Sequence, residues 1–177
     1  IKHPTTSQQQ KKSQTPNFYL LGKDFVEEST SKEDMEILFK QLGRLTKVAP
    51  VYFVYGNHEN KIKFTRNKLN QEIKKNNITI LNDQEVHFNN INLIGRKDYT
   101  NKKRKKTKDY HLTNNTYNIV LDHQPQGTKE NIKNNVDLNS VVTPTTFKCF
   151  HYLSLTTYNP TLRTITEKKH SNLHKNH

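Results

Sequence analysis

A layered α/β fold is the class that the sequence predicts for residues 17–138, and two observations support it. Short apolar segments rich in β-branched and aromatic residues alternate with segments whose apolar residues recur at helical spacing. Three of the apolar segments end abruptly in polar residues. Strands that alternate with helices indicate sheets covered by helices, so we expect a layered domain.

The first half of this region is predicted to form strand, helix, strand and helix. Residues 18–22 form a short strand pattern, and Ser31 is the expected N-cap of the first helix. The apolar residues of that helix follow at i, i+3, i+4 and i+7 spacing, and they are Met35, Leu38, Phe39, Leu42 and Leu45. Residues 51–55 form the second strand, and a weaker helix is predicted over residues 64–75.

The second half is predicted to contain mainly strands. Residues 78–81 form a third strand, followed by a turn at Asn82 and Asp83. Residues 86–88 and 91–94 are expected to pair as a hairpin. The last strand covers residues 118–121 and ends in Asp-His-Gln-Pro.

The two ends of the chain differ in composition from this region. Residues 1–16 contain no acidic residue and almost no apolar one, so we expect them to be disordered or damaged. Residues 139–177 contain one acidic residue, Glu167, and no sustained hydrophobic period. This tail is expected to be largely disordered or packed without specificity.

The chain is strongly basic, with a formal net charge of +13. Such a charge suits a polyanion partner, but Lys, Asn and Ile are abundant throughout, and no basic helix or aromatic platform accompanies the charge. We therefore favour compositional drift over nucleic-acid binding and expect residues 102–106, Lys-Lys-Arg-Lys-Lys, to form a solvated loop.

Location and redox compartment are only loosely constrained by the sequence. A single cysteine, Cys149, excludes an intrachain disulfide and fits a reducing compartment. No apolar run approaches the roughly 18 residues of a membrane-spanning helix. We expect a cytoplasmic or membrane-associated protein, with any membrane contact made through a missing N-terminal segment; the oligomeric state is left open.

The polar residues that follow three strands form the candidate site. They are Asp24, Asn57, His58 and His123, and the strand ends carry Gly-Lys-Asp-Phe, Gly-Asn-His-Glu and Asp-His-Gln-Pro. Ligands in layered α/β folds gather at the carboxyl ends of strands. One carboxylate, one carboxamide and two imidazoles suit Mn, Fe or Zn.

Each of these residues also has a structural interpretation. An Asp after a strand is usually a turn or cap residue, and a single His is more often a buried core residue than a ligand. The sequence Gly-Asn-His-Glu directly after an apolar strand is more specific, because no structural requirement explains that combination.

These motifs, in this order, resemble the calcineurin-like metallophosphoesterase family, and residues 94–99, Ile-Gly-Arg-Lys-Asp-Tyr, resemble its bacterial branch. The resemblance implies a four-layer αββα sandwich with two divalent metal ions that activate water for in-line attack on a phosphoester. It also implies that Asp24 bridges both ions and that Asn57 and His123 bind the second. His58 would contact the phosphate, as would Asn57, or protonate the leaving oxygen.

The sequence departs from the family pattern at both ends. No Asp-x-His motif precedes Asp24 to supply ligands of the first ion, and Lys23 places an ammonium group beside the expected cation site. The closing Gly-His-x-His motif is also absent. The resemblance therefore implies a partial αββα sandwich that retains at most one weak metal site.

A frame shift or a sequencing error near residue 139 would account for the second departure. One encoding of Gln-Leu-Ser-Gly-His-Thr-His, a continuation that resembles the family's, reads as residues 139–145 of this chain after loss of its first base. We hypothesise that residues 17–138 are an incomplete phosphoesterase domain and residues 139–177 a frame-shifted, non-native tail.

The function expected from the sequence is metal-dependent hydrolysis of a phosphomonoester or phosphodiester, impaired or absent in this chain. Two alternatives stay open. One is a non-catalytic basic module that binds nucleic acid or anionic lipid, and the other is a pseudogene product without function.

Overall fold

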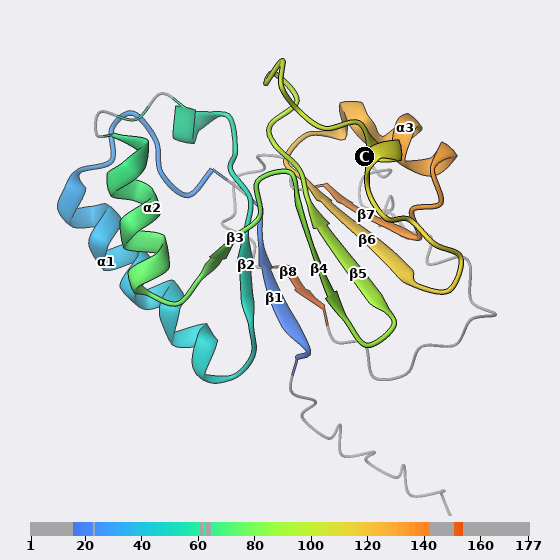
Figure 1. Ribbon diagram of the computed structural model, residues 1–177. Coiled ribbons are helices and arrows are strands. Elements are labelled where there is room, and N and C mark those ends of the chain that lie inside the picture. Colours follow the sequence, from blue (N-terminus) through green and yellow to red (C-terminus); the bar gives the residue numbers. More distant parts are fainter. Residues whose placement is uncertain (1–15, 23, 61, 63–64, 142–150, 154–177) are drawn as a thin grey trace, which may run out of the picture.

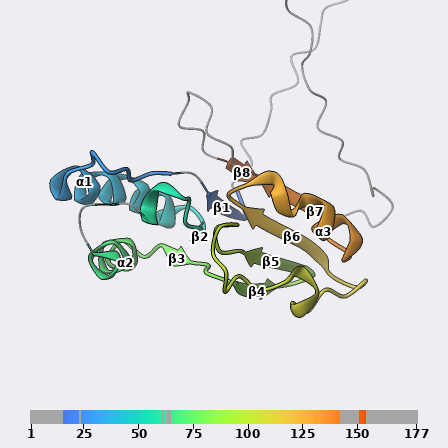
Figure 2. The same ribbon diagram turned by 90° about the horizontal axis from the view of Figure 1, so that it is seen from above.

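Two four-stranded sheets lie face to face between helices in the computed structural model (Figure 1). The structure describes residues 16–22, 24–60, 62, 65–141 and 151–153. Helices α1 and α2 cover one sheet, and α3 lies on the outer side of the other, as the view from above also shows (Figure 2). This arrangement confirms the predicted α/β class.

The first sheet has the strand order β3-β2-β1-β8. Its strands are β1 (Phe18–Leu21), β2 (Val51–Phe53), β3 (Thr79–Ile80) and β8 (His151–Leu153). The strands β1, β2 and β3 are parallel, whereas β8 pairs antiparallel with β1. The carboxyl ends of the three parallel strands therefore meet at one edge.

The second sheet has the order β4-β5-β6-β7. Its strands are β4 (Gln84–Phe88), β5 (Ile91–Gly95), β6 (Tyr117–Asp122) and β7 (Leu138–Val141). The predicted hairpin is confirmed as β4 and β5, which pair antiparallel around Asn89 at a φ of 51°. Strands β5, β6 and β7 are parallel.

The helices begin where their capping residues place them. Helix α1 (Lys32–Leu42) begins after Ser31, whose side chain accepts a hydrogen bond from the Asp34 backbone N–H, as predicted. Helix α2 (Arg66–Lys75) follows Thr65 in the same way. The short helix α3 (Thr128–Lys133) was not predicted, because its six residues show little apolar periodicity. No helix in the described part is long and apolar enough to cross a membrane.

Alternating side chains divide the apolar core between the layers. Phe53 packs with Met35 and Phe39 of α1, whereas its neighbour Tyr52 lies in the core between the sheets. On β6, Ile119 and Leu121 face the first sheet, and Val120 lies on the outer side. This period of two, with apolar residues on both faces, is what a sheet buried on both sides requires.

Most of the predicted strands are present with shifted ends. The second strand is shorter than expected, since β2 ends at Phe53 rather than at residue 55. Residues 139–141 belong to β7, and residues 151–153 form β8. Residues 1–15, 142–150 and 154–177 lie outside the described part, so the expected disorder of both ends and the frame shift near residue 139 stay predictions.

The prediction of a fully solvated basic run is wrong at one residue. Lys102, Lys103, Lys105 and Lys106 are exposed, but the Arg104 side chain is only 7% exposed. Its guanidinium bonds both carboxylate oxygens of Asp122 at the end of β6. The Asp122 carboxylate at the end of β6 thus holds Arg104 against the fold. The basic run alone gives no indication of this contact.

Arg104 belongs to a polar network that we call the arginine cluster, formed by the buried side chains of Arg96, Arg104, Asp122 and Asn131 together with Glu130, which is 40% exposed. Arg96 donates to Asn131 Oδ1 at 2.9 Å and lies 3.8 Å from Asp122. Glu130 accepts the Thr107 backbone N–H at 2.7 Å. The cluster joins the loop between β5 and β6 to α3.

Candidate active site

The predicted site residues come from strand ends in both sheets. Asp24 follows β1 and Asn57 follows β2, whereas His123 follows β6 of the second sheet. These strand ends lie along the upper edge of the molecule in Figure 1. The two facing sheets therefore bring together side chains separated by up to about 100 residues.

Three of the predicted residues meet through their polar atoms. His123 Nε2 lies 2.9 Å from Asn57 Oδ1 and 3.4 Å from Asp24 Oδ2. The Asp24 side chain is 6% exposed and that of His123 is 1% exposed. A carboxylate oxygen, an amide oxygen and an imidazole nitrogen thus converge in a nearly dry environment.

The backbone fixes the His123 ring. Its Nδ1 lies 3.1 Å from the Gly22 carbonyl oxygen, and a carbonyl can only accept, so Nδ1 carries the proton of the bond. In neutral imidazole, Nε2 then presents its lone pair to Asn57 and Asp24. A backbone carbonyl on one imidazole nitrogen is the usual support of a metal-binding histidine.

A cation suits this donor set. Three lone-pair atoms that face one another repel unless a proton or a cation lies between them. Metal–ligand bonds of about 2.1 Å at right angles place neighbouring ligand atoms roughly 3 Å apart. The two measured separations, 2.9 and 3.4 Å, are close to that spacing.

Glu59 links the two loops that carry Asp24 and Asn57. Its Oε1 accepts the backbone N–H groups of Phe25 and Val26 at 2.8 and 3.3 Å, and its Oε2 accepts that of Gly56 at 2.8 Å. The Asp24 loop and the Asn57 loop are thereby joined by one carboxylate. Burial and the neighbouring Asp24 charge raise the pKa of Glu59 to about 7, although the N–H groups of Phe25 and Val26 oppose the shift.

Gly56 is required by close packing. A Cβ atom at this position would lie 2.0 Å from Asp24 Oδ1 and 2.9 Å from Glu59 Oε2. Both distances are far below van der Waals contact, so a side chain would displace the Asp24 carboxylate. The glycine of the Gly-Asn-His-Glu motif thus allows the two loops to touch.

His58 contributes through its backbone and its ring. Its N–H donates to Asp24 Oδ1 at 2.9 Å, which orients the carboxylate. Its imidazole Nδ1 lies 3.2 Å from Glu28 Oε2, and the side chain is 38% exposed. The predicted contact of His58 with a phosphate stays a prediction.

The predicted site residues lie in the described part of the chain. The structure brings Asp24, Asn57 and His123 together and places the His58 backbone on Asp24. Lys23 lies outside the described residues. The described residues contain no group of three or more His, Cys, Asp or Glu side chains that could hold a metal ion. The candidate site therefore depends on a carboxamide, which is a weaker ligand than a carboxylate.

Two supporting carboxylates were missed. Glu59 was noted only as part of the motif and Glu28 was not singled out. An acidic residue a few positions after a glycine at a strand end is a signal for binding backbone N–H groups of the turn. That signal could have identified Glu59, whereas nothing in the sequence pairs Glu28 with His58.

Comparison with known proteins gives a consistent result. The model of the family "Calcineurin-like phosphoesterase" matches residues 5–163, beyond both ends of the predicted domain at residues 17–138. The "Uncharacterized metallophosphoesterase YkoQ" of Bacillus subtilis (strain 168) is 29% identical over 124 residues. That match covers 64% of this chain and 44% of the relative, so the chain spans less than half of the relative's length. No solved structure matches the chain significantly.

Proposed function

The chain belongs to the calcineurin-like phosphoesterase family, and on this premise we propose that it binds one divalent cation and a phosphoester at the ends of β1, β2 and β6. Divalent metal ions are typical of the family. In this proposal Asp24, Asn57 and His123 are the cation ligands. The reaction would be hydrolysis of a phosphomonoester or phosphodiester.

The convergence of three acceptor atoms is the observation that carries the proposal. Asn57 Oδ1 and Asp24 Oδ2 both lie within 3.4 Å of His123 Nε2, and Nδ1 of the same ring donates to the Gly22 carbonyl oxygen. A purely structural cluster would place a donor among them. A bound cation removes the repulsion and would supply Lewis-acid stabilisation of phosphoryl charge.

The residues of the chain itself would orient and protonate the substrate. Nδ1 of His58 is directed at Glu28, and in this proposal Nε2 of the same ring contacts a phosphate or a leaving oxygen. The Asn57 amide N–H group can donate to the same phosphate while its oxygen faces the cation site. Glu59 keeps the two loops in register, so the groups do not have to reorganise during the reaction.

We further propose that the activity of this chain is low. Two-metal catalysis requires ligands for both ions, and His123, Asn57 and Asp24 account for one. Among the described residues no additional imidazole or carboxylate completes a second cluster. A single cation can polarise the phosphoryl group, but water activation and charge neutralisation would both be weaker.

The test is hydrolysis of bis(4-nitrophenyl) phosphate by the full chain with Mn²⁺, before and after His58→Ala. Loss of the His58 contact to the phosphoryl group is expected to lower kcat by roughly a hundredfold. His87→Ala is the matched control, because His87 lies on the edge strand β4 and its ring is half exposed. Equal rates for the wild type and His58→Ala would remove the enzymatic proposal for this chain.

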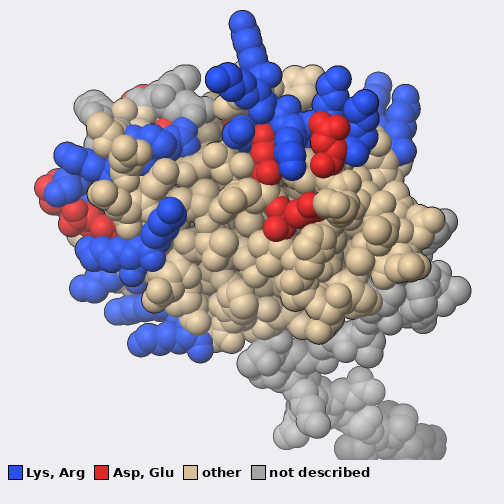
Figure 3. All heavy atoms as spheres, in the orientation of Figure 1, with Lys and Arg blue, Asp and Glu red and all other residues tan. Residues whose placement is uncertain are grey.

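The basic-module alternative has one supporting observation. Figure 3 shows Lys and Arg side chains along the upper edge of the molecule, where the loop between β5 and β6 lies. Arg104 anchors this loop to Asp122, so Lys102, Lys103, Lys105 and Lys106 are presented from a fixed base. Salt-dependent DNA binding that disappears when these four lysines are replaced by Gln would favour this alternative.

A further inference from the structure

Two sheet edges follow each other in the chain, and they differ in length. Strand β3 ends the first sheet with two residues, Thr79–Ile80, whereas β4 ends the second sheet with five, Gln84–Phe88. The view from above shows β4 at the outer border of its sheet, beyond β5 (Figure 2). A five-residue edge presents a row of backbone groups with which a further strand can pair.

Alternate residues of β4 direct their backbone groups toward this open edge. Phe88 pairs with Ile91 where the hairpin closes, so every second residue counted back from Phe88 exchanges hydrogen bonds with β5. The N–H and C=O groups of Glu85 and His87 therefore point away from β5, and they bond no backbone group of the described residues. Two donors and two acceptors of β4 are left for another strand.

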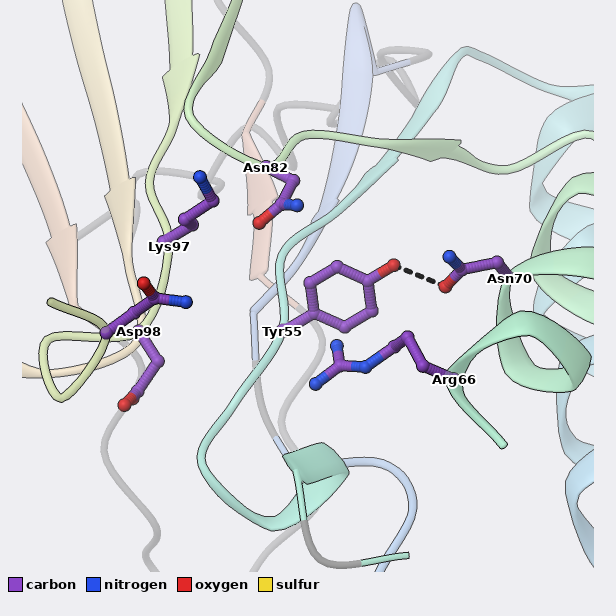
Figure 4. Close-up of a pocket in the computed structure, with 7 residues that line it drawn as sticks. Tyr55, Arg66, Asn70, Asn82, Lys97 and Asp98 are labelled. Atoms are coloured by element: carbon purple, nitrogen blue, oxygen red, sulfur yellow. Dashed lines mark hydrogen bonds between the residues drawn. The ribbon is translucent and has the colours of Figure 1, made fainter. Parts of the chain in front are cut away.

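Backbone turns limit the β4 edge at both ends. Asp83 precedes the strand at a φ of 60° and Asn89 follows it at a φ of 51°, so neither residue continues the extended chain. The Asp83 carboxylate accepts the backbone N–H groups of Lys97 and Lys105, both at 2.9 Å. Lys97 and Asn82 line one side of a pocket at this turn, opposite helix α2 (Figure 4). The start of β4 is thus held in place, which preorganises the edge for pairing.

Strand β4 lacks the features by which edge strands usually avoid association. Its sequence, Gln-Glu-Val-His-Phe, contains no Pro and no Lys, and its register with β5 runs without a bulge. Figure 3 shows few Lys or Arg side chains over the middle of this face, where β4 lies in Figure 1. Glu85 is the one acidic residue of the strand, so the residue that faces it decides what the edge can bind.

A second copy of β4 places a histidine opposite Glu85. Two copies that pair antiparallel around a two-fold axis at Val86 align all five residues, and the outward backbone groups of Glu85 meet those of the partner's His87. An axis at Glu85 would set two carboxylates opposite each other, which is unfavourable. An axis at His87 would bring the turn at Asn89 into the pairing. Strand length, backbone bonding and charge therefore select the same register.

The two faces of β4 also suit this pairing. On the outer face, Glu85 Oε2 lies 3.9 Å from His87 Nε2 of its own strand and accepts the His111 backbone N–H at 3.2 Å, which holds the carboxylate on that face. On the inner face, half-buried Val86 borders a groove of about 560 Å³ between β4 and β3, where Ile80 lines the opposite side. A second strand beside β4 would remove part of this apolar border from water.

We propose that the chain forms a two-fold dimer by antiparallel pairing of β4 with β4 of a second copy. The contact uses both β4 edges, so it closes at two copies instead of continuing into a fibre. We expect a dissociation constant in the micromolar range, because a five-residue strand pair is small against the interfaces of about 1,600 Å² typical of stable complexes. The inference does not depend on the proposed function, since the contact contains no residue of the candidate cation site.

Cysteine cross-linking tests the register. Val86 lies on the proposed axis, so Val86→Cys should form a disulfide between two copies under mild oxidation, in a Cys149→Ser background that removes the native thiol. Gln84→Cys is the matched control on the same face of the strand. Its two copies would be offset by about 13 Å along the strand, beyond the reach of a disulfide. No cross-linked dimer of Val86→Cys, or an equal yield for Gln84→Cys, overturns the proposal.

Sedimentation velocity of the full chain, over about a hundredfold range of concentration, tests the backbone pairing. His87→Pro removes an outward N–H without removing a hydrogen bond to β5, and it should raise the dissociation constant at least about tenfold, because each copy loses one bond. His87→Ala keeps the N–H and should still dimerise. A His87→Pro chain that dimerises as well as His87→Ala overturns the proposal, as does a wild type that stays monomeric.

Charge pairing separates the β4 contact from any other dimer surface and does not depend on the proline variant. His87→Glu sets two carboxylates opposite each other, and the double variant Glu85→Lys, His87→Lys sets two ammonium groups opposite each other. Each variant alone should dimerise about tenfold more weakly than the wild type. Their mixture pairs a carboxylate with an ammonium group at both positions, so it should form a heterodimer. A mixture that associates no better than either variant alone overturns the proposal.

Discussion

The candidate cation site and the arginine cluster are both buried polar groups beside β6, and they are built in opposite ways. In the arginine cluster, Asp122 receives two hydrogen bonds from Arg104 and the charge of Arg96 at 3.8 Å. In the cation site, the Asp24 carboxylate and the Asn57 oxygen both face one imidazole nitrogen, Nε2 of His123. His123, which follows Asp122 directly, connects the two.

The contrast distinguishes a structural polar group from a functional one. Guanidinium and carboxylate charges are matched in the arginine cluster, where Arg96 Nε is the one buried atom without a hydrogen-bond partner among the described residues. Acceptors are in excess in the cation site, so the folded chain is incomplete without a positive charge. Removal of an acidic residue should therefore have opposite consequences in the two places.

The largest effect is expected from Asp122→Asn. It removes the charged partner of buried Arg104 and leaves Arg96 with Glu130 alone, which should lower the free energy of unfolding by about 3 kcal/mol. Urea denaturation of the metal-free chain measures this value. The matched change Asp24→Asn should cost less than about 1 kcal/mol, because it also relieves repulsion from Glu59. An equal decrease in the free energy of unfolding in Asp122→Asn and Asp24→Asn would contradict this difference between the arginine cluster and the cation site.

Gly56→Ala should have the next largest effect, because the new Cβ overlaps Asp24 Oδ1. We expect a loss of about 2 kcal/mol, typical of overpacking, together with weaker Mn²⁺ binding. Gly43→Ala is the control, since its Cβ would approach the Asn76 side chain at 2.9 Å, far from the site. A Gly56→Ala protein that binds Mn²⁺ like the wild type would show that the two loops need not touch.

Mn²⁺ should raise the melting temperature of the wild type. A cation that binds only the folded chain stabilises it by about 2.7 kcal/mol at a concentration of one hundred times Kd. His123→Ala should abolish the shift, and His87→Ala should retain it. A Mn²⁺-dependent shift that survives His123→Ala would place the cation elsewhere.

The smallest effect concerns pH and the arginine cluster. Burial raises the pKa of Glu130, but the hydrogen bond from Thr107 and the Arg96 charge outweigh it, so the pKa lies below its usual value. A lowered pKa stabilises the fold above the unfolded-state value and loses that contribution as the pH falls through the folded-state value. Urea denaturation between about pH 6 and 3 should therefore show a steeper loss for the wild type than for Glu130→Gln. Identical slopes would mean that Glu130 adds no stability.

The sequence predicted the strands and the first helix well because their periods and caps are local. Ser31 and the spacing of Met35 and Phe39 required no tertiary information. Helix α3 was missed, since six residues are too few to show a period. The Arg104 partner was missed because Asp122 is distant in the chain and a basic run gives no sign that one member is buried.

The residues of the candidate site could be predicted from the sequence, but the contacts that hold them in place could not. The motifs at the strand ends predicted Asp24, Asn57 and His123. The carboxyl ends of parallel strands lie at the same edge of a sheet, which brings these residues together. The Gly22 carbonyl on His123 and the Glu59 bonds to backbone N–H groups depend on loop conformations. Backbone groups have no signature in the sequence, so these contacts could only be seen in three dimensions.

The return of β8 to the edge of β1 has a consequence for synthesis of the chain. About 130 residues separate the end of β1 from the start of β8, so β1 leaves the ribosome roughly 10 s before its antiparallel neighbour is made. During that interval the hydrogen-bonding edge of β1 is open to any other nascent strand. Chaperone contact with the growing polypeptide should accordingly be greatest before residue 151 emerges.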